Sequence, residues 1–397
     1  MNILIISPGF HPVTGGHGGA VENLINIFLQ ENDEKYKNNV TVYSAKRGNS
    51  FDKQIYKHTN FRLIDIGTFL YKIKHLTKNL YRVLSGKSKQ RYYINEIIND
   101  LKKKNEINYY DLIIFENGDE FISYFKKKTK TSSKIVLHLH NDHINVNNPN
   151  SLEIIDNVDE FWAVSKFIKN RIDGVKLTNK VKVLYNTIDY KLFKKNVSEE
   201  EVSSLKFKYN ISKDDFVFIY VGRVMDDKGT LELVNAFDQL NKKYNNIKLL
   251  VVGGSISLKN DSDYLNKVRD VSINNKNIIF TGQIKNYDLY KFYQISNCQI
   301  IPSKWEEPFG LIALEGVASN IKIISSYSGG LPEIFENDCL YVDRKNLTED
   351  LIKKMDFVIN DKTSIDMVVY ERIMNKFSKE NYCDTFNSYI KEFNEKR

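Results

Sequence analysis

The sequence predicts an α/β protein built from two doubly wound, Rossmann-like domains in tandem, and three observations lead to this prediction. The chain of 397 residues exceeds what one hydrophobic core usually serves. Short apolar runs rich in β-branched residues alternate with helical stretches from start to finish. The runs are continuous, which is what strands buried on both faces of a parallel sheet require.

The candidate strands fall into two series, and the polar stretch from about Lys194 to Asp215 between them is the best linker candidate. We therefore expect one domain over residues 1–192, completed by the C-terminal helix at about 380–397, and a second domain over residues 193–379. Ligands of open α/β sheets bind beyond the carboxyl ends of the strands, so two such domains facing each other define a cleft. The first series is Asn2–Ser7, Val40–Ser44, Arg62–Ile66, Leu112–Phe115, Ile135–His140, Glu160–Val164 and Val181–Leu184, and the second is Phe216–Val221, Lys248–Val252, Ile278–Thr281, Gln299–Pro302 and Lys322–Ser325.

The cysteines and the start of the chain bear on the compartment. Cys298, Cys339 and Cys383 are far apart and form no CxxC pair, which argues against a disulfide framework or a zinc site. No cationic-then-apolar signal segment opens the chain, and the opening run NILIISP is too short to span a bilayer. We expect a cytoplasmic protein.

The net charge of +8 comes entirely from the first half of the chain. Through Tyr190 there are 28 Lys and Arg against 20 Asp and Glu, and the remainder holds 30 of each. A surplus placed in this way suggests an anionic partner for that half.

Part of this surplus lies in a predicted amphipathic helix over Phe69–Leu84, in which Lys72, Lys74, Lys78 and Arg82 fall off the apolar stripe. Such a helix could rest on anionic lipid and hold the protein at the inner face of the cell membrane. A core-facing helix with a solvated basic face fits the same pattern. Nucleic acid is not an expected partner, because the aromatic residues lie with the apolar stripe.

The strongest functional pattern is Pro302-Ser-Lys-Trp-Glu-Glu-Pro-Phe-Gly-Leu-Ile-Ala-Leu-Glu315, in which a strand ends and a helix begins near Phe309 or Gly310. The free N–H groups and positive dipole end of such a helix suit a diphosphate. Glu307 precedes the helix, and Glu315 lies about 7–8 Å further along its axis. The two carboxylates could hold opposite ends of one ligand, although an ordinary amphipathic helix with two exposed glutamates gives the same pattern.

A second pattern, Val221-Gly-Arg-Val-Met-Asp-Asp-Lys-Gly229, directly follows a predicted strand. Gly222 allows close approach of the backbone, and Arg223 and Lys228 place two cations at the carboxyl end of the strand. Two fixed cations can replace Mg²⁺ in neutralising a nucleoside diphosphate leaving group. A turn with solvated charges is the alternative interpretation of this pattern alone.

Together these motifs make the chain resemble the family-4 retaining glycosyltransferases of the bacterial polysaccharide-assembly type, which have the GT-B fold. The resemblance runs through nearly the whole chain and rests on the order and spacing of its elements. They are the glycine-rich first loop, Val164-Ser165-Lys166, Asn186-Thr-Ile-Asp189, GRVMDDKG, VVGG, FTGQI, the Glu-x7-Glu pair and Ser328-Gly-Gly-Leu-Pro-Glu333.

The resemblance implies roles for residues that contact the diphosphate and the sugar of the donor. Arg223 and Lys228 look like the diphosphate-binding pair. Glu307 resembles the first Glu of the family motif, which contacts the donor hexose near the reacting centre. The backbone groups of Phe309, Gly310 and Leu311 are similarly expected to approach the sugar and the phosphates.

The resemblance also implies how the nucleoside and the acceptor are held. Glu315 resembles the second Glu of the motif, which holds ribose, and Ile284 sits where the family binds the base through its main chain. In Thr14-Gly-Gly-His-Gly-Gly-Ala-Val-Glu22 the glycines favour close contact with a ligand, and the family's loop reaches the diphosphate and the acceptor, so Gly15 and Gly16 are the expected residues. A surface turn is the alternative here.

The segment Leu137-His-Leu-His-Asn-Asp-His143 ends the fifth predicted strand, and alternation points His138 and His140 the same way. His140 matches the family's histidine at this strand end, which contacts the donor sugar. Metal binding is the competing function for three close histidines, but the donor-side cations already do a metal's work, so we expect no metal and no cofactor. For His138 and His143 we expect structural roles.

Two further strings fail as sites. The glycine-rich first loop is not a GxGxxG fingerprint, because Val21 occupies the place of the third glycine, so a dinucleotide site is not expected. Asp261-Ser-Asp263 could hold a metal only at a strand end, and we interpret it as a solvated turn in a polar loop.

The sequence as a whole predicts retaining transfer of a hexosyl group from an NDP-sugar, expected to be a UDP-sugar, to a hydroxyl of a glycan or lipid-linked glycan. The resemblance implies a same-face mechanism in which the departing phosphate accepts the proton of the acceptor, so no protein nucleophile is required. A nucleotide-sugar epimerase and a non-catalytic nucleotide-sugar-binding subunit are the alternatives. The epimerase would release product without any acceptor.

Overall fold

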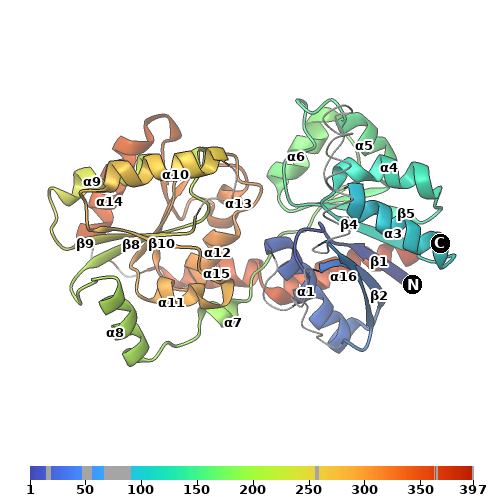
Figure 1. The fold of residues 1–397 in the computed structure, drawn as a ribbon, viewed down its shortest axis with the longest axis horizontal. Helices are drawn as coiled ribbons and strands as arrows, with labels where there is room; N and C mark the ends of the chain where they lie inside the picture. The colour runs from blue at the N-terminus through green and yellow to red at the C-terminus, as the bar shows by residue number, and fades with distance from the viewer. Residues whose placement is uncertain are drawn as a thin grey trace. The chain divides into compact units, whose positions relative to one another are not determined.

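Each half of the chain folds around its own parallel sheet (Figure 1). The computed structural model describes residues 1–14, 19–46, 56–66, 91–254, 259–361, 363 and 365–395. The first unit comprises Met1–Asn186 and Lys379–Arg397, and the second unit comprises Thr187–Ser378. Both units belong to the doubly wound α/β class that the sequence predicts.

The sheet of the first unit has seven strands in the order β3-β2-β1-β4-β5-β6-β7, and every neighbouring pair is parallel. Ile3, Leu4 and Ile5 are 0 % exposed, because the centre of the sheet is covered on both faces. The strands are β1 (Asn2–Ile6), β2 (Asn39–Lys46), β3 (Thr59–Asp65), β4 (Leu112–Glu116), β5 (Lys134–Leu139), β6 (Glu160–Ala163) and β7 (Val181–Val183).

Helix α16 (Lys379–Glu395) completes the core of the first unit, although it ends the chain. The ring of Phe386 stacks on Phe28 at 4.0 Å and meets Trp162 edge-on at 4.9 Å. The other helices described in this unit are α1 (Ala20–Glu31), the π-helical turn η1 (Asn32–Tyr36), α3 (Arg91–Lys103), α4 (Asp119–Thr129), α5 (Ser151–Asn157) and α6 (Lys166–Val175).

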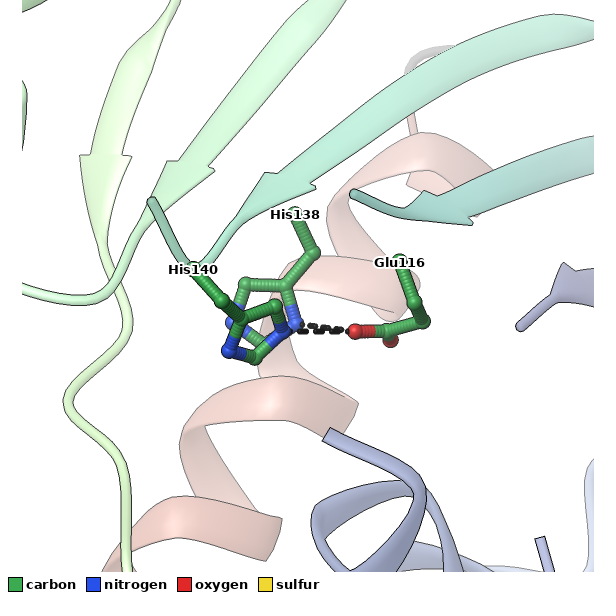
Figure 2. A group of neighbouring side chains, drawn as sticks. All are labelled: Glu116, His138 and His140. Atoms are coloured by element: carbon green, nitrogen blue, oxygen red, sulfur yellow. Dashed lines mark hydrogen bonds and ion pairs between the residues drawn. The ribbon is translucent and has the colours of Figure 1, made fainter. Parts of the chain in front are cut away.

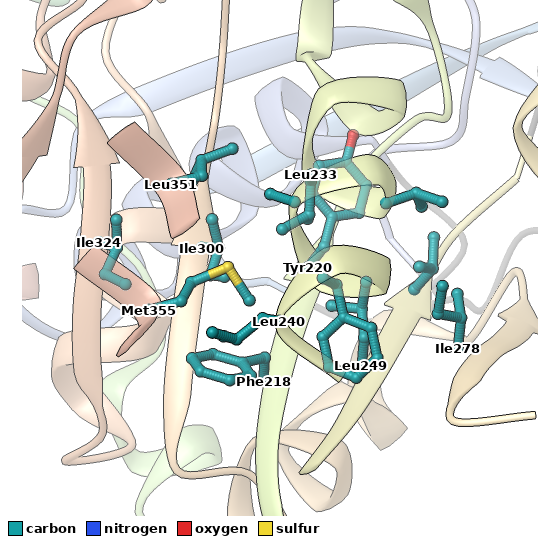
Figure 3. Packing of buried hydrophobic residues seen from close by; sticks show 14 of the residues in the cluster. Phe218, Tyr220, Leu233, Leu240, Leu249, Ile278, Ile300, Ile324, Leu351 and Met355 are labelled. Carbon is teal, nitrogen blue, oxygen red and sulfur yellow. The ribbon is translucent and has the colours of Figure 1, made fainter. Parts of the chain in front are cut away.

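The sheet of the second unit has six parallel strands in the order β10-β9-β8-β11-β12-β13. Figure 3 shows its core, in which Phe218 and Ile300 of the sheet pack with Leu240 and Met355 of the covering helices. The strands are β8 (Phe216–Val221), β9 (Ile247–Val252), β10 (Ile278–Gly282), β11 (Cys298–Ile301), β12 (Lys322–Ser326) and β13 (Leu340–Val342). The last of these was not predicted.

The helices described in the second unit connect and cover these strands. They are α7 (Tyr190–Phe193), α8 (Glu199–Lys208), η2 (Asp226–Lys228), α9 (Thr230–Asn241), α10 (Lys259–Ser272), η3 (Asn286–Asp288), α11 (Leu289–Gln294), α12 (Leu311–Ala318), α13 (Leu331–Phe335), η4 (Arg344–Asn346), α14 (Leu347–Asn360) and α15 (Met367–Lys376).

Two local predictions are wrong. The stretch Lys194–Asp215 is not a linker, because it lies inside the second unit and contains helix α8, which Ser198 caps by accepting the backbone N–H of Glu201 at 3.2 Å. Asp261-Ser-Asp263 lies in helix α10 rather than in a polar loop. That helix forms because Val268, with its apolar neighbours, packs on the core of the unit.

The strand order reverses at one point in each sheet. In the first unit the reversal lies between β1 and β4, and in the second unit it lies between β8 and β11. Open α/β sheets bind their ligands at the carboxyl ends of the strands that flank such a reversal. The loops after these strands are therefore the places to look for a site.

Candidate functional site

The two sequence motifs of the second unit follow β8 and β11, on either side of its reversal point, and their loops are bonded to each other. The backbone carbonyl of Asp227 accepts the N–H groups of Lys304 at 2.8 Å and Trp305 at 2.9 Å. Gly229 has a φ of 67°, and a Cβ there would lie 2.0 Å from the carbonyl oxygen of Pro302. The glycine that ends the first motif is therefore required for the two loops to approach.

Lys228 and Glu307 form the centre of this candidate site. The Nζ of Lys228 lies 2.6 Å from Oε1 of Glu307, and the two side chains are 18 % and 12 % exposed. Ser303 donates its hydroxyl to the same oxygen at 2.5 Å. The structure thus brings together one predicted residue from each motif, and the interpretation of Glu307 as an exposed glutamate of an ordinary helix is wrong.

Helix α12 begins at Leu311, directly after the loop that holds Glu307. Its N-cap is Gly310, which has a φ of 100° and provides no side chain to accept the first N–H groups of the helix. A Cβ at Gly310 would lie 2.4 Å from Cδ2 of Leu331, so glycine is required twice over. The first turn of α12 therefore presents N–H donors and the positive dipole end beside the Lys228–Glu307 pair, which is the arrangement that binds phosphate.

Phe309 differs from its neighbours because its side chain belongs to the core. It is 2 % exposed, and its ring meets that of Phe377 edge-on at 5.4 Å. Only the backbone of Phe309 can face a ligand in this conformation, as the resemblance implies.

Glu315 is the fifth residue of α12 and has a partner of its own. Its Oε2 accepts the hydroxyl of Tyr293 at 2.9 Å, and that hydroxyl in turn accepts Nε2 of Gln299 at 3.0 Å. Burial raises the pKa of Glu315 to about 7, although the hydrogen bond from Tyr293 acts in the opposite direction. Without a ligand, Glu315 therefore changes its charge near neutral pH.

The sequence analysis missed the residues that hold the Glu307 loop in place. Glu306 accepts the backbone N–H of Gly329 at 2.6 Å and the guanidinium of Arg344 at 2.7 Å. The N–H of Gly330 donates to the carbonyl of Glu307 at 2.7 Å. A Cβ at Gly329 would lie 2.1 Å from that same carbonyl oxygen. The glycine pair was recognised as part of a family motif, but nothing local in the sequence indicates which loop it supports.

The remaining predicted residues of the second unit are placed less tightly. Arg223 is exposed, and within the described residues no ion pair fixes its guanidinium. Ile284 is half-buried and follows the edge strand β10, whose last residue, Gly282, accepts the N–H of Gly253 at 3.0 Å. Among the described contacts, none joins Ile284 to Glu307 or to Glu315.

In the first unit, a buried cluster of Glu116, His138 and His140 lies at the carboxyl ends of β4 and β5 (Figure 2). Oε2 of Glu116 lies 2.8 Å from Nε2 of His140 and 2.9 Å from Nδ1 of His138. The prediction that His138 and His140 point the same way is confirmed, and Glu116 was missed because it reads as the end of an apolar strand. His143 lies apart from the cluster, with its Nδ1 3.3 Å from Asp119.

This cluster has a defined charge state. Burial alone would raise the pKa of Glu116, but His138 and His140 outweigh burial through their charge and hydrogen bonds and lower it to about 2. Burial lowers the pKa of His140 to about 4, although Glu116 opposes this change. At neutral pH Glu116 is therefore a carboxylate and His140 is neutral.

Glu116, His138 and His140 are also the group that could hold a metal ion, since one ligand atom of each lies within 4.8 Å of the others. Three such ligands suit zinc or another transition metal. The contact of 2.8 Å between His140 and Glu116 is equally a direct hydrogen bond, whereas Nδ1 of His138, at 2.9 Å, makes no hydrogen bond. The distances alone do not require an ion.

Several predicted features fall outside the described residues. These are Gly15 and Gly16, and the basic amphipathic segment with Lys72, Lys74 and Lys78. Arg82 of the same segment also lies outside the described residues. None of the helices in the described part of the chain combines the length and apolar character that a membrane crossing needs.

Comparison with solved structures identifies the fold as GT-B, that of a large class of glycosyltransferases. Anabaena HepE in complex with UDP and glucose matches with a TM-score of 0.72 at 17 % identity, over 98 % of this chain and 99 % of that one. The sucrose-phosphate synthase of Thermosynechococcus elongatus matches with a TM-score of 0.75 at 18 % identity, over the whole of both chains.

Sequence comparison then shows which proteins the chain resembles. Residues 201–376, which lie in the second unit, match the model of the glycosyl transferases group 1. The lipopolysaccharide 1,2-N-acetylglucosaminetransferase of Salmonella typhimurium is 26 % identical over 72 % of this chain and 74 % of its own length. The capsular polysaccharide biosynthesis glycosyltransferase CapM of Staphylococcus aureus is 28 % identical over 58 % of this chain and 62 % of its own. Residues 201–376 of the chain thus resemble the group 1 glycosyltransferases.

Proposed function

We propose that this chain transfers a hexosyl group from a nucleoside diphosphate sugar to a hydroxyl acceptor, and that the donor is a UDP-sugar. The observation that carries the proposal is the meeting of Lys228, Glu307 and the start of helix α12 at the reversal point of the second sheet. A cation and free helix N–H groups together suit a diphosphate. Anabaena HepE, which shares the fold, binds UDP and glucose.

The diphosphate of the donor is bound by the side chains of Arg223 and Lys228 and by the backbone of Gly310 and Leu311. Lys228 forms an ion pair with Glu307 in the structure. The ammonium group of Lys228 would therefore contact both this carboxylate and the phosphate of an incoming donor. This pairing fixes the ammonium group before the donor arrives, which lowers the cost of ordering it. Arg223, which is exposed, supplies the second charge after it moves to the ligand.

The sugar and the nucleoside are assigned to the two acidic residues. Glu307 and the backbone of Phe309 contact the hexose, and Glu315 accepts hydrogen bonds from the ribose hydroxyls. Ile284 contacts the base through its main chain. These assignments follow the family motif, and they agree with a Glu307 that is held at its Oε1 and a Glu315 that is held at its Oε2.

The groups of the first unit complete the proposed set. His140 contacts the transferred sugar, and Gly15 and Gly16 approach the phosphates and the acceptor. Transfer proceeds with retention, because the departing phosphate takes the proton of the acceptor hydroxyl on the face from which it leaves. The cations of the site do the work that Mg²⁺ performs in metal-dependent transferases, so we propose that no metal is required.

The acceptor is a glycan or a lipid-linked glycan of the cell surface, as the lipopolysaccharide and capsule relatives suggest. The basic segment with Lys72, Lys74, Lys78 and Arg82 would bring the enzyme to an anionic membrane surface. Co-sedimentation with anionic vesicles tests this association, and changing the four residues to Glu should abolish it. Changing Lys126, Lys127 and Lys128 of α4 to Glu is the matched control, and equal loss in both variants would contradict a specific role.

The main experiment measures UDP release from a panel of UDP-sugars, with and without lipid-linked glycan acceptors. We expect release that depends on the acceptor, persists in EDTA and yields a product with the anomeric configuration of the donor. An epimerised sugar formed without acceptor, or an inverted product, would contradict the proposal. Thermal shift with the same sugars selects the donor, because a ligand that binds only the folded state raises its melting temperature.

A further inference from the structure

The cluster of Glu116, His138 and His140 holds its imidazoles more firmly than a core contact requires. In Figure 2 the two histidine rings lie one over the other, each with one nitrogen turned to the same carboxylate oxygen. Their ring centroids are 4.0 Å apart. The side chains of His138, His140 and Glu116 are 0 %, 5 % and 1 % exposed, so water does not compete for these bonds.

The charge state of the cluster determines where the protons lie. Glu116 is a carboxylate at neutral pH and can only accept hydrogen bonds. A neutral imidazole carries one N–H, and the Nε2 of His140 is the nitrogen that bonds to Glu116 at 2.8 Å. The proton of His140 therefore resides on Nε2, and Nδ1 keeps its lone pair.

The opposite nitrogens of the two rings lack partners. Nδ1 of His140 and Nε2 of His138 are buried, and the described residues offer neither of them a hydrogen bond. Nδ1 of His138 and Oε1 of Glu116 likewise lack a hydrogen bond, so the bond from His140 to Glu116 is the one that the described part of the cluster makes. A buried acceptor without a partner is unfavourable and uncommon in proteins, and it calls for an explanation such as a role in binding or catalysis. In His140 the free nitrogen can accept a hydrogen bond from a hydroxyl group, as a sugar would offer.

The other ionisable groups near Glu116 favour their neutral forms, so Glu116 carries the negative charge of the cluster. Burial raises the pKa of Glu22 to about 7, and Glu116 adds to this rise. Burial likewise raises the pKa of the Tyr382 hydroxyl well above its usual value, with Glu116 contributing. Both effects favour the neutral forms of these neighbours.

We propose that Glu116 is a positioning residue, which holds His140 as its Nε2–H tautomer so that Nδ1 accepts a hydrogen bond from a hydroxyl of the sugar substrate. The inference rests on the proposed function, in which His140 contacts the transferred sugar. His138 assists by placing its Nδ1 2.9 Å from the same carboxylate oxygen and packing its ring against that of His140 at a tilt of 51°. Phe386 and Trp162 in turn meet the ring of His138 edge-on at 6.2 and 6.1 Å.

The test compares Glu116→Gln with Glu160→Gln, each carrying the same change of a buried carboxylate to an amide. Glu160 lies on β6, is 7 % exposed, and bonds to Trp162 and Lys182 rather than to a histidine. Nitrogen-15 NMR of the histidine-labelled protein reads the tautomer directly, and His140→Asn assigns the signal among the seven histidines. An amide can donate to Nε2, so Glu116→Gln permits the Nδ1–H tautomer that the carboxylate excludes.

We expect wild type and Glu160→Gln to show His140 as the Nε2–H tautomer, and Glu116→Gln to show the Nδ1–H form. The kcat of Glu116→Gln should fall by about 10–100-fold, the usual effect of removing a group that orients a functional imidazole. Its affinity for UDP, which lacks the transferred hexose, should match that of wild type. Unchanged melting temperatures would show that both variants fold.

Three results would overturn the inference. They are a wild-type His140 in the Nδ1–H form, a Glu116→Gln variant with a changed tautomer but normal kcat, and stoichiometric zinc in the purified protein that is lost in that variant. The NMR result needs no turnover, so it separates this inference from the proposed function. If wild type transfers no sugar while the tautomers behave as expected, the proposed function fails and the tautomer control stands.

Discussion

The reversal points of the two sheets carry polar side chains of opposite character. In the second unit the groups are partly exposed, the cation Arg223 has no fixed partner among the described residues, and the start of helix α12 has no side-chain cap. In the first unit Glu116 and His140 are buried and bonded to each other, while Nδ1 of His140 has no partner among the described residues. We infer from this contrast that the second unit receives a charged ligand, whereas the first holds one imidazole in a fixed state. Four predictions test this contrast.

The largest expected effect is that of Glu307→Ala on turnover. If Glu307 contacts the sugar near the reacting centre, kcat should fall by about 10²–10³-fold, as for other groups that stabilise a transition state. UDP affinity should change far less than kcat, because UDP carries no hexose and loses only the pairing of Glu307 with Lys228. Steady-state kinetics and calorimetry with UDP measure the two effects. Glu336→Ala removes an exposed glutamate of the same unit and serves as the control, and normal kcat in Glu307→Ala would refute the role.

Lys228→Ala should act mainly on donor binding. Loss of one charge-assisted contact to a phosphate weakens binding by about 1.5–3 kcal/mol, or about 10–100-fold in the KM for the donor. Lys304→Ala is the matched control, because Lys304 lies in the adjacent loop but pairs with Asp226 and Glu232. Equal effects of the two changes would mean that Lys228 has no special contact with the donor.

The pKa of Glu315 makes both stability and binding depend on pH. Because its folded-state pKa of about 7 lies above its ordinary value, the folded state binds more protons, and its contribution to stability falls as pH rises from about 5 to 8. Glu315→Gln should flatten this fall, by about 2–3 kcal/mol, in chemical denaturation at pH 5 and pH 8. Donor binding should weaken below pH 7 in wild type but not in the variant. A variant as pH-dependent as wild type in both measurements would contradict this role.

The smallest expected effect is that of salt, which should weaken UDP binding by the second unit but leave the His140 tautomer of the first unit unchanged. Raising ionic strength from about 0.05 to 0.5 M shortens the screening length severalfold, so UDP affinity should fall several-fold. The tautomer of His140 should not change, because its bond to Glu116 is buried. Calorimetry and nitrogen-15 NMR under both conditions check this. A tautomer that shifts with salt would show that the cluster is open to solvent.

The amino-acid pattern predicted the sheets well because buried parallel strands have a strong local signature. Runs such as Leu112–Phe115 and Phe216–Val221 are apolar throughout, and both became strands. Helix α8 was mistaken for a linker because it buries no residue and therefore shows no apolar stripe. Its N-cap, Ser198, was the available signal.

The site was predictable where its residues are close in sequence and missed where contacts are distant. A glycine at the start of a helix or the end of a strand is a signal that can be recognised within one segment. Gly229 and Gly310 could be predicted from this signal. Glu116 meets His138 and His140 only after two strands pair in register, and Glu306 meets Arg344 only after the second sheet is complete. No spacing within one segment indicates such pairs.

Binding of UDP compared with uridine tests the central claim most directly. If Lys228 and the start of α12 hold the diphosphate, wild type should bind UDP at least about 100-fold more tightly than uridine. Uridine lacks the phosphates and therefore cannot form the charge-assisted hydrogen bonds. Lys228→Ala should lose most of this preference while its affinity for uridine stays unchanged. Equal binding of UDP and uridine by wild type, or a full preference for UDP in Lys228→Ala, would contradict the account.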